Sequence, residues 1–129
     1  MSDAHTVSIW FPGEWPDLNS YIDAERANRY RAAKLKRVYT DKAREIAKAA
    51  GVGRVHTPCE VRFIWHLADG RKDPDNVAAM GCKVILDGLV RAGVLPNDGQ
   101  KQIWRIVHEF VKDGREGVRV ELTRKDGGK

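Results

Sequence analysis

The sequence predicts a small α+β protein in which helices pack against a mixed β-sheet. Segments in which apolar and polar residues alternate predict four strands, and two longer segments with apolar residues at every third or fourth position predict helices. These segments follow one another in the order β-α-β-α-β-β, which is typical of helices packed on one small sheet. The chain has 129 residues, so we assign residues 1–129 to a single domain.

The N-terminal half is expected to contain one strand and a long helical region. Residues 6–11 alternate and are rich in β-branched and aromatic side chains, which is typical of a strand. Residues 23–50 carry an apolar stripe at helical spacing, and a glycine follows them. Thr40-Asp41 can cap a second helix, so this region is either one helix or two.

The C-terminal half is expected to contain three strands and one helix. Residues 60–66 alternate, so Val61, Phe63 and Trp65 share one face of a strand. A polar loop follows, and then residues 77–92 have the pattern of a helix. The last two predicted strands are residues 103–111 and 118–122. A Gly-containing turn at Asp113 separates them, so we expect them to pair as a hairpin.

The positive charge of the chain is concentrated in the long helical region. The net charge is +5, and residues 24–50 hold nine basic and three acidic residues, a net +6, so the rest of the chain sums to −1. Such a basic element is typical of proteins that contact a phosphate backbone, although it also describes a solvated helix face. The candidate DNA-binding residues are the densest group, Arg29, Arg31, Lys34, Lys36 and Arg37.

Several classes of protein do not fit the sequence. No apolar run reaches the roughly 20 residues of a membrane span, so we expect no membrane partner. No secretory signal is recognisable, which predicts a cytoplasmic protein. Cys59 and Cys82 match no zinc spacing and are expected to be reduced core thiols. No glycine-rich phosphate loop is present, which excludes a nucleotide triphosphatase. We also expect no small-molecule cofactor.

Three acidic residues flank the second predicted helix. Asp73 and Asp75 stand at its start, in the run Asp-Pro-Asp-Asn, and Asp98 follows its end in an Asn-Asp turn. Magnesium prefers oxygen ligands and is usually held by few carboxylates, so these acids are candidate metal ligands. The spacing alone leaves another interpretation open, because acids also cap helices and Asn-Asp pairs are common in turns.

A resemblance to a known family favours the metal interpretation. Residues 71–76 (Arg-Lys-Asp-Pro-Asp-Asn), residues 83–89 (Lys-Val-Ile-Leu-Asp-Gly-Leu) and residues 92–98, which end in Asn-Asp, resemble the signature of the RusA-type Holliday-junction resolvases. The resemblance implies an α+β homodimer that binds four-way DNA junctions and cuts paired strands with Mg²⁺, for which Mn²⁺ can substitute. It implies that Asp73, Asp75 and Asp98 bind the metal and act in catalysis. It also suggests a bacterial or phage-infected host.

The chain departs from the family pattern in the helix. Lys83, the residue that the resemblance makes catalytic, lies seven residues after Asn76, whereas the more familiar pattern places this lysine three residues after the asparagine. Lys83 reaches the acids if residues 77–81 form a loop or a distorted turn. Otherwise Arg71 or Lys72 supplies the positive charge, and Lys83 forms a surface pair with Asp87. Asn76 and Asp87 are expected to have supporting roles.

The expected function is therefore a Mg²⁺-dependent endodeoxyribonuclease that resolves four-way junctions and leaves 5′-phosphate and 3′-hydroxyl ends. Arg71 and Lys72 are further candidates for contacts with the DNA. Two alternatives stay open: a protein that binds branched DNA without cutting it, and a less selective metal-dependent nuclease. Comparing cleavage of a four-way junction with cleavage of a linear duplex distinguishes the resolvase from the second alternative.

Overall fold

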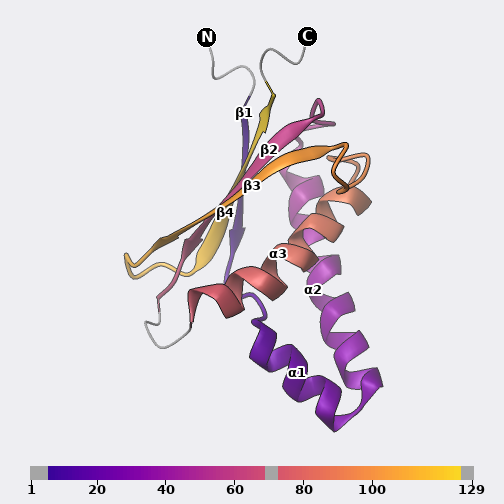
Figure 1. Ribbon diagram of the computed structural model, residues 1–129, viewed down its shortest axis with the longest axis vertical. Coiled ribbons are helices and arrows are strands. Elements are labelled where there is room, and N and C mark those ends of the chain that lie inside the picture. Colours follow the sequence, from indigo (N-terminus) through magenta and orange to yellow (C-terminus); the bar gives the residue numbers. More distant parts are fainter. Residues whose placement is uncertain (1–5, 69–72, 126–129) are drawn as a thin grey trace.

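The computed structural model describes residues 6–68 and 73–125, which form four strands and three helices (Figure 1). In chain order these are β1 (Thr6–Pro12), α1 (Leu18–Ala27), α2 (Arg29–Ala50), β2 (Cys59–His66), α3 (Pro74–Arg91), β3 (Ile103–Val111) and β4 (Gly117–Arg124). The α+β class and the mixed sheet are confirmed. No helix of the described part is both long and apolar enough to cross a membrane.

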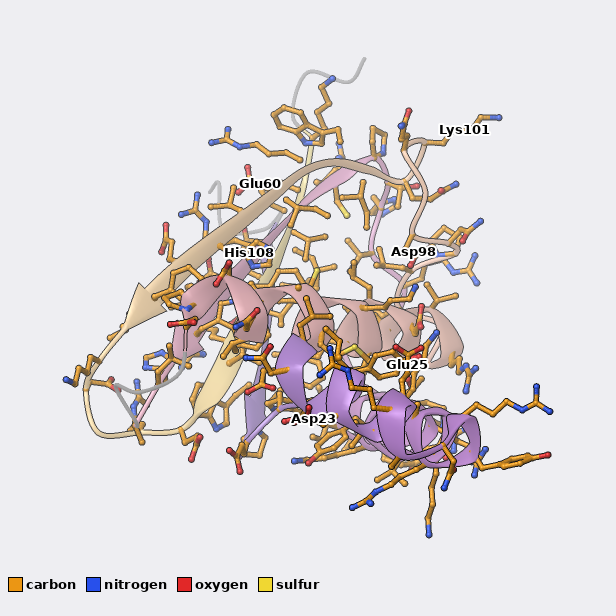
Figure 2. All side chains as sticks on the ribbon, turned by 60° about the horizontal axis from the view of Figure 1, so that its bottom comes forward. Asp23, Glu25, Glu60, Asp98, Lys101 and His108 are labelled. Atoms are coloured by element: carbon orange, nitrogen blue, oxygen red, sulfur yellow. The ribbon has the colours of Figure 1, made fainter. Side chains whose placement is uncertain are left out.

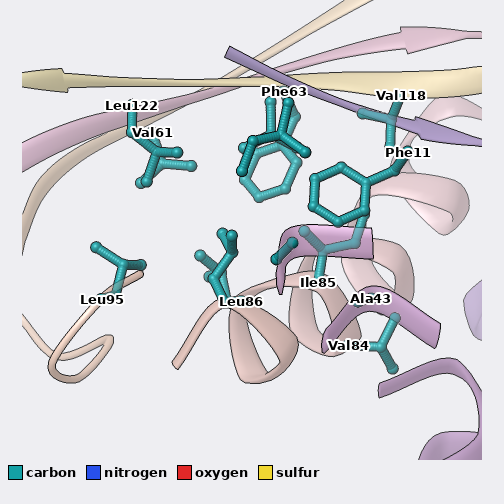
Figure 3. Packing of buried hydrophobic residues seen from close by; sticks show 14 of the residues in the cluster. Phe11, Ala43, Val61, Phe63, Val84, Ile85, Leu86, Leu95, Val118 and Leu122 are labelled. Carbon is teal, nitrogen blue, oxygen red and sulfur yellow. The ribbon is translucent and has the colours of Figure 1, made fainter. Parts of the chain in front are cut away.

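The four strands form one sheet in the order β1-β4-β2-β3. β2 is parallel to β3 and antiparallel to β4, and β1 is antiparallel to β4. The parallel pair requires a crossover connection, which α3 supplies. The helices pack on one side of the sheet, where side chains from β2 and β4 meet those of α3 (Figures 1 and 3).

The expected hairpin between the last two strands is wrong. β3 and β4 are consecutive in sequence, but β2 lies between them and pairs with both. The crossover through α3 places β3 beside β2 at the edge of the sheet, so the connection to β4 passes over the end of β2. His66, the last residue of β2, contacts this connection through its Nδ1, which lies 3.0 Å from Asp113 Oδ2.

The long helical region is two helices, and they meet at Asn28 rather than at Thr40-Asp41. Asn28 has an extended backbone, and its side-chain oxygen accepts a hydrogen bond of 2.8 Å from the Arg31 N–H. This is the geometry of an N-cap, for which asparagine is a preferred residue. Thr40 is instead buried inside α2, with 2% of its surface exposed.

The core is built from alternate residues of the two central strands. Val61, Phe63 and Trp65 of β2 are at most 1% exposed, as the alternation predicts. Val118, Val120 and Leu122 of β4 are fully buried. Cys59 is buried and Cys82 is half-buried, and no disulfide joins these two cysteines. Burial raises the pKa of the Cys59 thiol to about 11.

Two glycines allow α3 to lie close to its neighbours. A Cβ atom at Gly81 would lie 2.5 Å from Cη2 of Trp65, and one at Gly88 would lie 2.5 Å from the Cβ of Ala43 in α2. Both distances are far below van der Waals contact, so a larger residue at either position would push the helix away. Gly81 therefore serves close packing and does not interrupt α3.

Candidate functional site

The start of α3 positions the first two candidate ligands. Asp73 is the N-cap residue, with an extended backbone, and Pro74 occupies the first helical turn, where its missing N–H is harmless. The Asp73 carbonyl accepts hydrogen bonds from the Asn76 and Val77 N–H groups at 3.1 and 3.2 Å. The Asp73 carboxylate does not cap the helix. Helix capping by its side chain therefore does not explain why residue 73 is an aspartate.

Asp75 borders a groove between α3 and β3. The groove is lined on the α3 side by Pro74, Asp75, Ala78, Ala79 and Cys82, and on the β3 side by His108 and Phe110. Asp73 and Asp75 are both exposed. The N-terminus of a helix also carries a partial positive charge, which stabilises carboxylates nearby. An accessible carboxyl group thus stands at one end of a largely apolar groove.

The third candidate, Asp98, follows α3 in the chain. It is exposed, and its N–H donates to the Asn97 side-chain oxygen at 2.9 Å. Burial and, to a smaller extent, the charge of Asp98 raise the pKa of the Cys82 thiol to about 12, while Lys83 acts in the opposite direction. The Asp98 carboxylate therefore acts on the part of α3 near Cys82. In Figure 2 His108 and Asp98 lie over the helix towards different ends.

A single chain does not gather the three acids into one cluster. Within residues 6–68 and 73–125 there is no group of three or more His, Cys, Asp or Glu side chains that could hold a metal ion. The reason is the length of α3, which has 18 residues and is therefore about 27 Å long. Cys82, near which Asp98 acts, is seven residues after Asp75, or about 10 Å along the helix axis.

The structure gives Lys83 a different position from the one that a local loop would provide. Residues 77–81 are helical, so α3 is continuous from Asn76 to Lys83, and the two are about 10 Å apart along the axis. Lys83 is exposed, and among the ion pairs of the described residues none joins it to Asp87, which is half-buried. Asn76 is half-buried at the start of the helix. Asn76 is nearer to Asp73 and Asp75 along the chain than Lys83 or Asp87 is.

The basic candidates of α2 lie at its N-terminal half, next to the turn from α1. Arg29, Arg31, Lys34 and Arg37 are exposed, and Lys36 is half-buried. No acidic residue occupies the first turn of α2, where the helix dipole would favour one. Tyr30 is 75% exposed and lies 5.6 Å from the Arg29 guanidinium. Helix stability does not explain this arrangement. Arg71 and Lys72 lie outside the residues that the structure describes.

Sequence reasoning missed the part of β3 that lines the groove. His108 accepts a hydrogen bond from the Trp65 indole N–H at 3.0 Å through its Nδ1, so its Nε2 carries the proton when the ring is neutral. Burial lowers the pKa of His108, which favours the neutral form. The position of His108 depends on which strand neighbours β2. A strand pattern alone does not contain that information.

Comparison with models of protein families and with curated proteins gave no match for this chain. The resemblance to the RusA-type resolvases therefore rests on the motifs of residues 71–98 and stays a prediction.

Proposed function

We propose that this protein is a Mg²⁺-dependent, structure-selective endodeoxyribonuclease that resolves four-way DNA junctions by paired nicks. The observation that carries the proposal is the start of α3, where the exposed acids Asp73 and Asp75 flank Pro74 and the Asp73 carboxylate takes no part in capping. These acids fall within the run of residues that resembles the resolvase signature.

The two carboxylates suit a magnesium ion. Mg²⁺ in enzymes that act on phosphate esters is typically held by one or two carboxylates, with water and substrate phosphate as its remaining ligands. Asp73 and Asp75 satisfy that need without a third acid from the same chain. When bound, such an ion polarises the scissile phosphate and activates water for in-line attack. The products would carry 5′-phosphate and 3′-hydroxyl ends.

Asp98 fits this site only if a second chain supplies it. Within the described part of one chain, Asp98 belongs to no group of three acids that could hold a metal ion. A homodimer in which the two α3 helices run in opposite directions would place Asp98 of the partner subunit towards Asp75. Such a dimer holds two equal sites related by a twofold axis. Paired symmetric nicks in a four-way junction require two sites of this kind.

The α1–α2 hairpin is suited to contact the DNA backbone. Its turn is far from the sheet (Figure 1) and carries exposed Arg29 and Arg31 next to exposed Tyr30. Arginines bind phosphates in a bidentate manner and without regard to base sequence. A dimer would present two such hairpins to two duplex arms. Selectivity for junctions would then come from the angle between the arms rather than from base contacts.

Cleavage of a labelled synthetic four-way junction tests the proposal. Wild-type protein, Asp75→Asn and the control Glu121→Gln, which removes one negative charge from β4, are incubated with Mg²⁺ or EDTA. A linear duplex of the same sequence is the reference substrate. We expect Mg²⁺-dependent symmetric nicks for wild type and control, ends that DNA ligase can seal, and at least a roughly 100-fold lower rate for folded Asp75→Asn, because it lacks one of two metal-binding carboxylates.

Other outcomes identify the alternatives. Tight junction binding without nicks, with or without Mg²⁺, would make the protein a non-catalytic junction binder. Equal cleavage of junction and duplex would make it a less selective nuclease. Unchanged cleavage by folded Asp75→Asn would overturn the assignment of the site.

A further inference from the structure

β3 is an edge strand whose inner face is not fully covered. Among the described strands it pairs with β2 alone. In this register Ile106 lies beside Val61 and Phe110 lies beside Trp65. Val61 and Trp65 are at most 1% exposed, whereas Ile106 is 45% and Phe110 is 41% exposed. The apolar face of the sheet therefore continues past the area that α3 covers.

The uncovered area forms one wall of the groove already described. Phe110 and His108 line it from β3, and Ala78, Ala79 and Cys82 line it from α3. Apolar side chains at an unpaired edge are a site where another strand tends to add. A partner that continues the sheet would cover this groove and satisfy the free backbone groups at the same time.

The hydrogen bonds of β3 determine which backbone groups are free. The Val111 carbonyl accepts from the Leu67 N–H at 3.0 Å, so the backbone groups of Val111 face β2. Backbone groups alternate in direction along a strand. Those of Ile106, His108 and Phe110 therefore point to the free side, while those of Arg105, Val107 and Glu109 point to β2. Symmetric pairing of two copies must respect this alternation.

We propose that β3 pairs antiparallel with β3 of a second copy of this chain, about a twofold axis at Val107. Ile106 then forms a hydrogen-bonded pair with His108 of the partner subunit, which matches the direction of their free backbone groups. Arg105 lies opposite Glu109 of the partner subunit, and Glu109 lies opposite Arg105 of the partner subunit. Two oppositely charged pairs thus form at once, and such cross-strand pairs stabilise a sheet.

The charge pattern of β3 selects this register over its neighbours. A twofold axis at Arg105 or at Glu109 would place like charges opposite each other. An axis at Ile106 or at His108 would place both charged residues opposite apolar ones. An axis between two residues would set free backbone groups against groups already bonded to β2. The register centred on Val107 alone satisfies both the backbone and the charges.

The interface would also bring the two grooves together. Pairing places the start of one β3 beside the end of the other, so the loop that carries Asp98 of the partner subunit comes towards the end of the groove at Asp75. The proposed function places Asp98 of the partner subunit there. The proposed pairing itself rests on the strand, however, and holds whether or not the protein cuts DNA.

Charge reversal tests the register. The mass of full-length protein is measured by sedimentation and light scattering for wild type, Arg105→Glu, Glu109→Arg, the double variant and the control Arg124→Glu, an exposed arginine of β4. We expect each single variant to raise the dimer dissociation constant roughly tenfold or more, because two attractive pairs become two repulsive ones. The double variant restores opposite charges, so its dimer dissociation constant should return towards the wild-type value. The control should have the wild-type dissociation constant.

A disulfide provides a second test that does not depend on ion pairs within the chain, where Arg105 contacts Glu60 and Glu109 contacts Arg62. Antiparallel neighbours that are not hydrogen-bonded are about 4.5 Å apart between Cα atoms, within reach of a disulfide. Oxidised Val107→Cys should therefore form a covalent dimer, and Val111→Cys, which faces Ile103 of the partner subunit, should not. A monomeric wild type, or a dimer unaffected by either test, would overturn the interface, while the cleavage assay would judge the proposed function separately.

Discussion

Asp113 holds the connection between β3 and β4 against the end of β2. Its Oδ2 lies 3.0 Å from His66 Nδ1, and its Oδ1 accepts from the Arg115 N–H at 3.2 Å. The hydrogen bond with His66 lowers the pKa of Asp113 below its ordinary value of 3.8, and the bonds from Arg115 lower it further. The ionised carboxylate is therefore stabilised more in the folded than in the unfolded protein.

Asp113→Asn should destabilise the protein at neutral pH. Because the folded pKa is lowered, the stabilising effect of Asp113 is fully present above pH 3.8 and is lost as the pH falls through the folded pKa. The difference in the free energy of unfolding between wild type and Asp113→Asn should therefore decrease as the pH falls from 3.8 through the folded pKa. Urea denaturation across this range measures it. A difference that does not decrease below pH 3.8 would contradict the assignment.

Gly81→Ala should destabilise the protein although alanine favours helices. In an open helical position this change gains up to about 1 kcal/mol. Here the new Cβ would lie 2.5 Å from Cη2 of Trp65, and overpacking of this kind costs about 1–3 kcal/mol. Urea denaturation of Gly81→Ala in wild-type and Trp65→Phe backgrounds separates the two effects. The cost should decrease with Phe at position 65. Net stabilisation of wild type by the alanine would show that α3 is not held close to β2.

The residue scale also shows where sequence reasoning succeeds. Alternation alone identifies Val61, Phe63 and Trp65 as one buried face, because a strand with one covered face must alternate. The alternation does not explain why position 81 is a glycine, and from the sequence this glycine is compatible with a loop or a distorted turn. That glycine depends on the side chain it meets, and Trp65 comes from an element 16 positions earlier in the chain.

At the scale of elements, the basic half of α2 should determine affinity for DNA. Replacing Arg29, Arg31 and Lys34 by Gln should weaken junction binding and reduce the slope of log K against log salt by up to about 0.9 for each phosphate that the variant no longer neutralises. The control variant replaces Arg54, Lys101 and Arg124 by Gln. These residues are exposed outside α2, and the change in net charge is the same. Fluorescence titrations at several salt concentrations measure both sets. Equal effects of the two sets would mean that net charge, not α2, attracts the DNA.

The type and extent of most elements could be predicted, and their neighbours could not. Ile103–Val111 was predicted with the bounds that the structure has, because its turns and periodicity are local. Its pairing with β2 rather than β4 follows from the crossover through α3, which no local pattern encodes. The break between α1 and α2 at Asn28 could not be predicted either, because an asparagine can stand inside a helix as well as between two helices. Its capping hydrogen bond to Arg31 identifies it only in three dimensions.

At the scale of the whole molecule, the central claim is that two chains complete each acidic site. The sequence motifs name Asp73, Asp75 and Asp98. In one described chain the first two stand at the start of a continuous 18-residue helix, and no group that could hold a metal ion includes all three. The motif could not reveal this separation, because it reports order along the chain and not distance. The proposed dimer, with oppositely directed α3 helices, would resolve it, and its sites would each combine Asp75 of one chain with Asp98 of the partner subunit.

Mixing two inactive variants tests this claim most directly. Asp75→Asn and Asp98→Asn are each expected to be inactive on a four-way junction with Mg²⁺. If the chains exchange, a mixed dimer holds one site with both changes and one site with neither, so it should nick a single strand. When the chains pair randomly at equal concentrations, up to about half of all dimers are mixed. Recovery of single nicks on mixing is the expected result. Persistent inactivity of mixed dimers, with both variants folded, would contradict the claim that two chains complete each site.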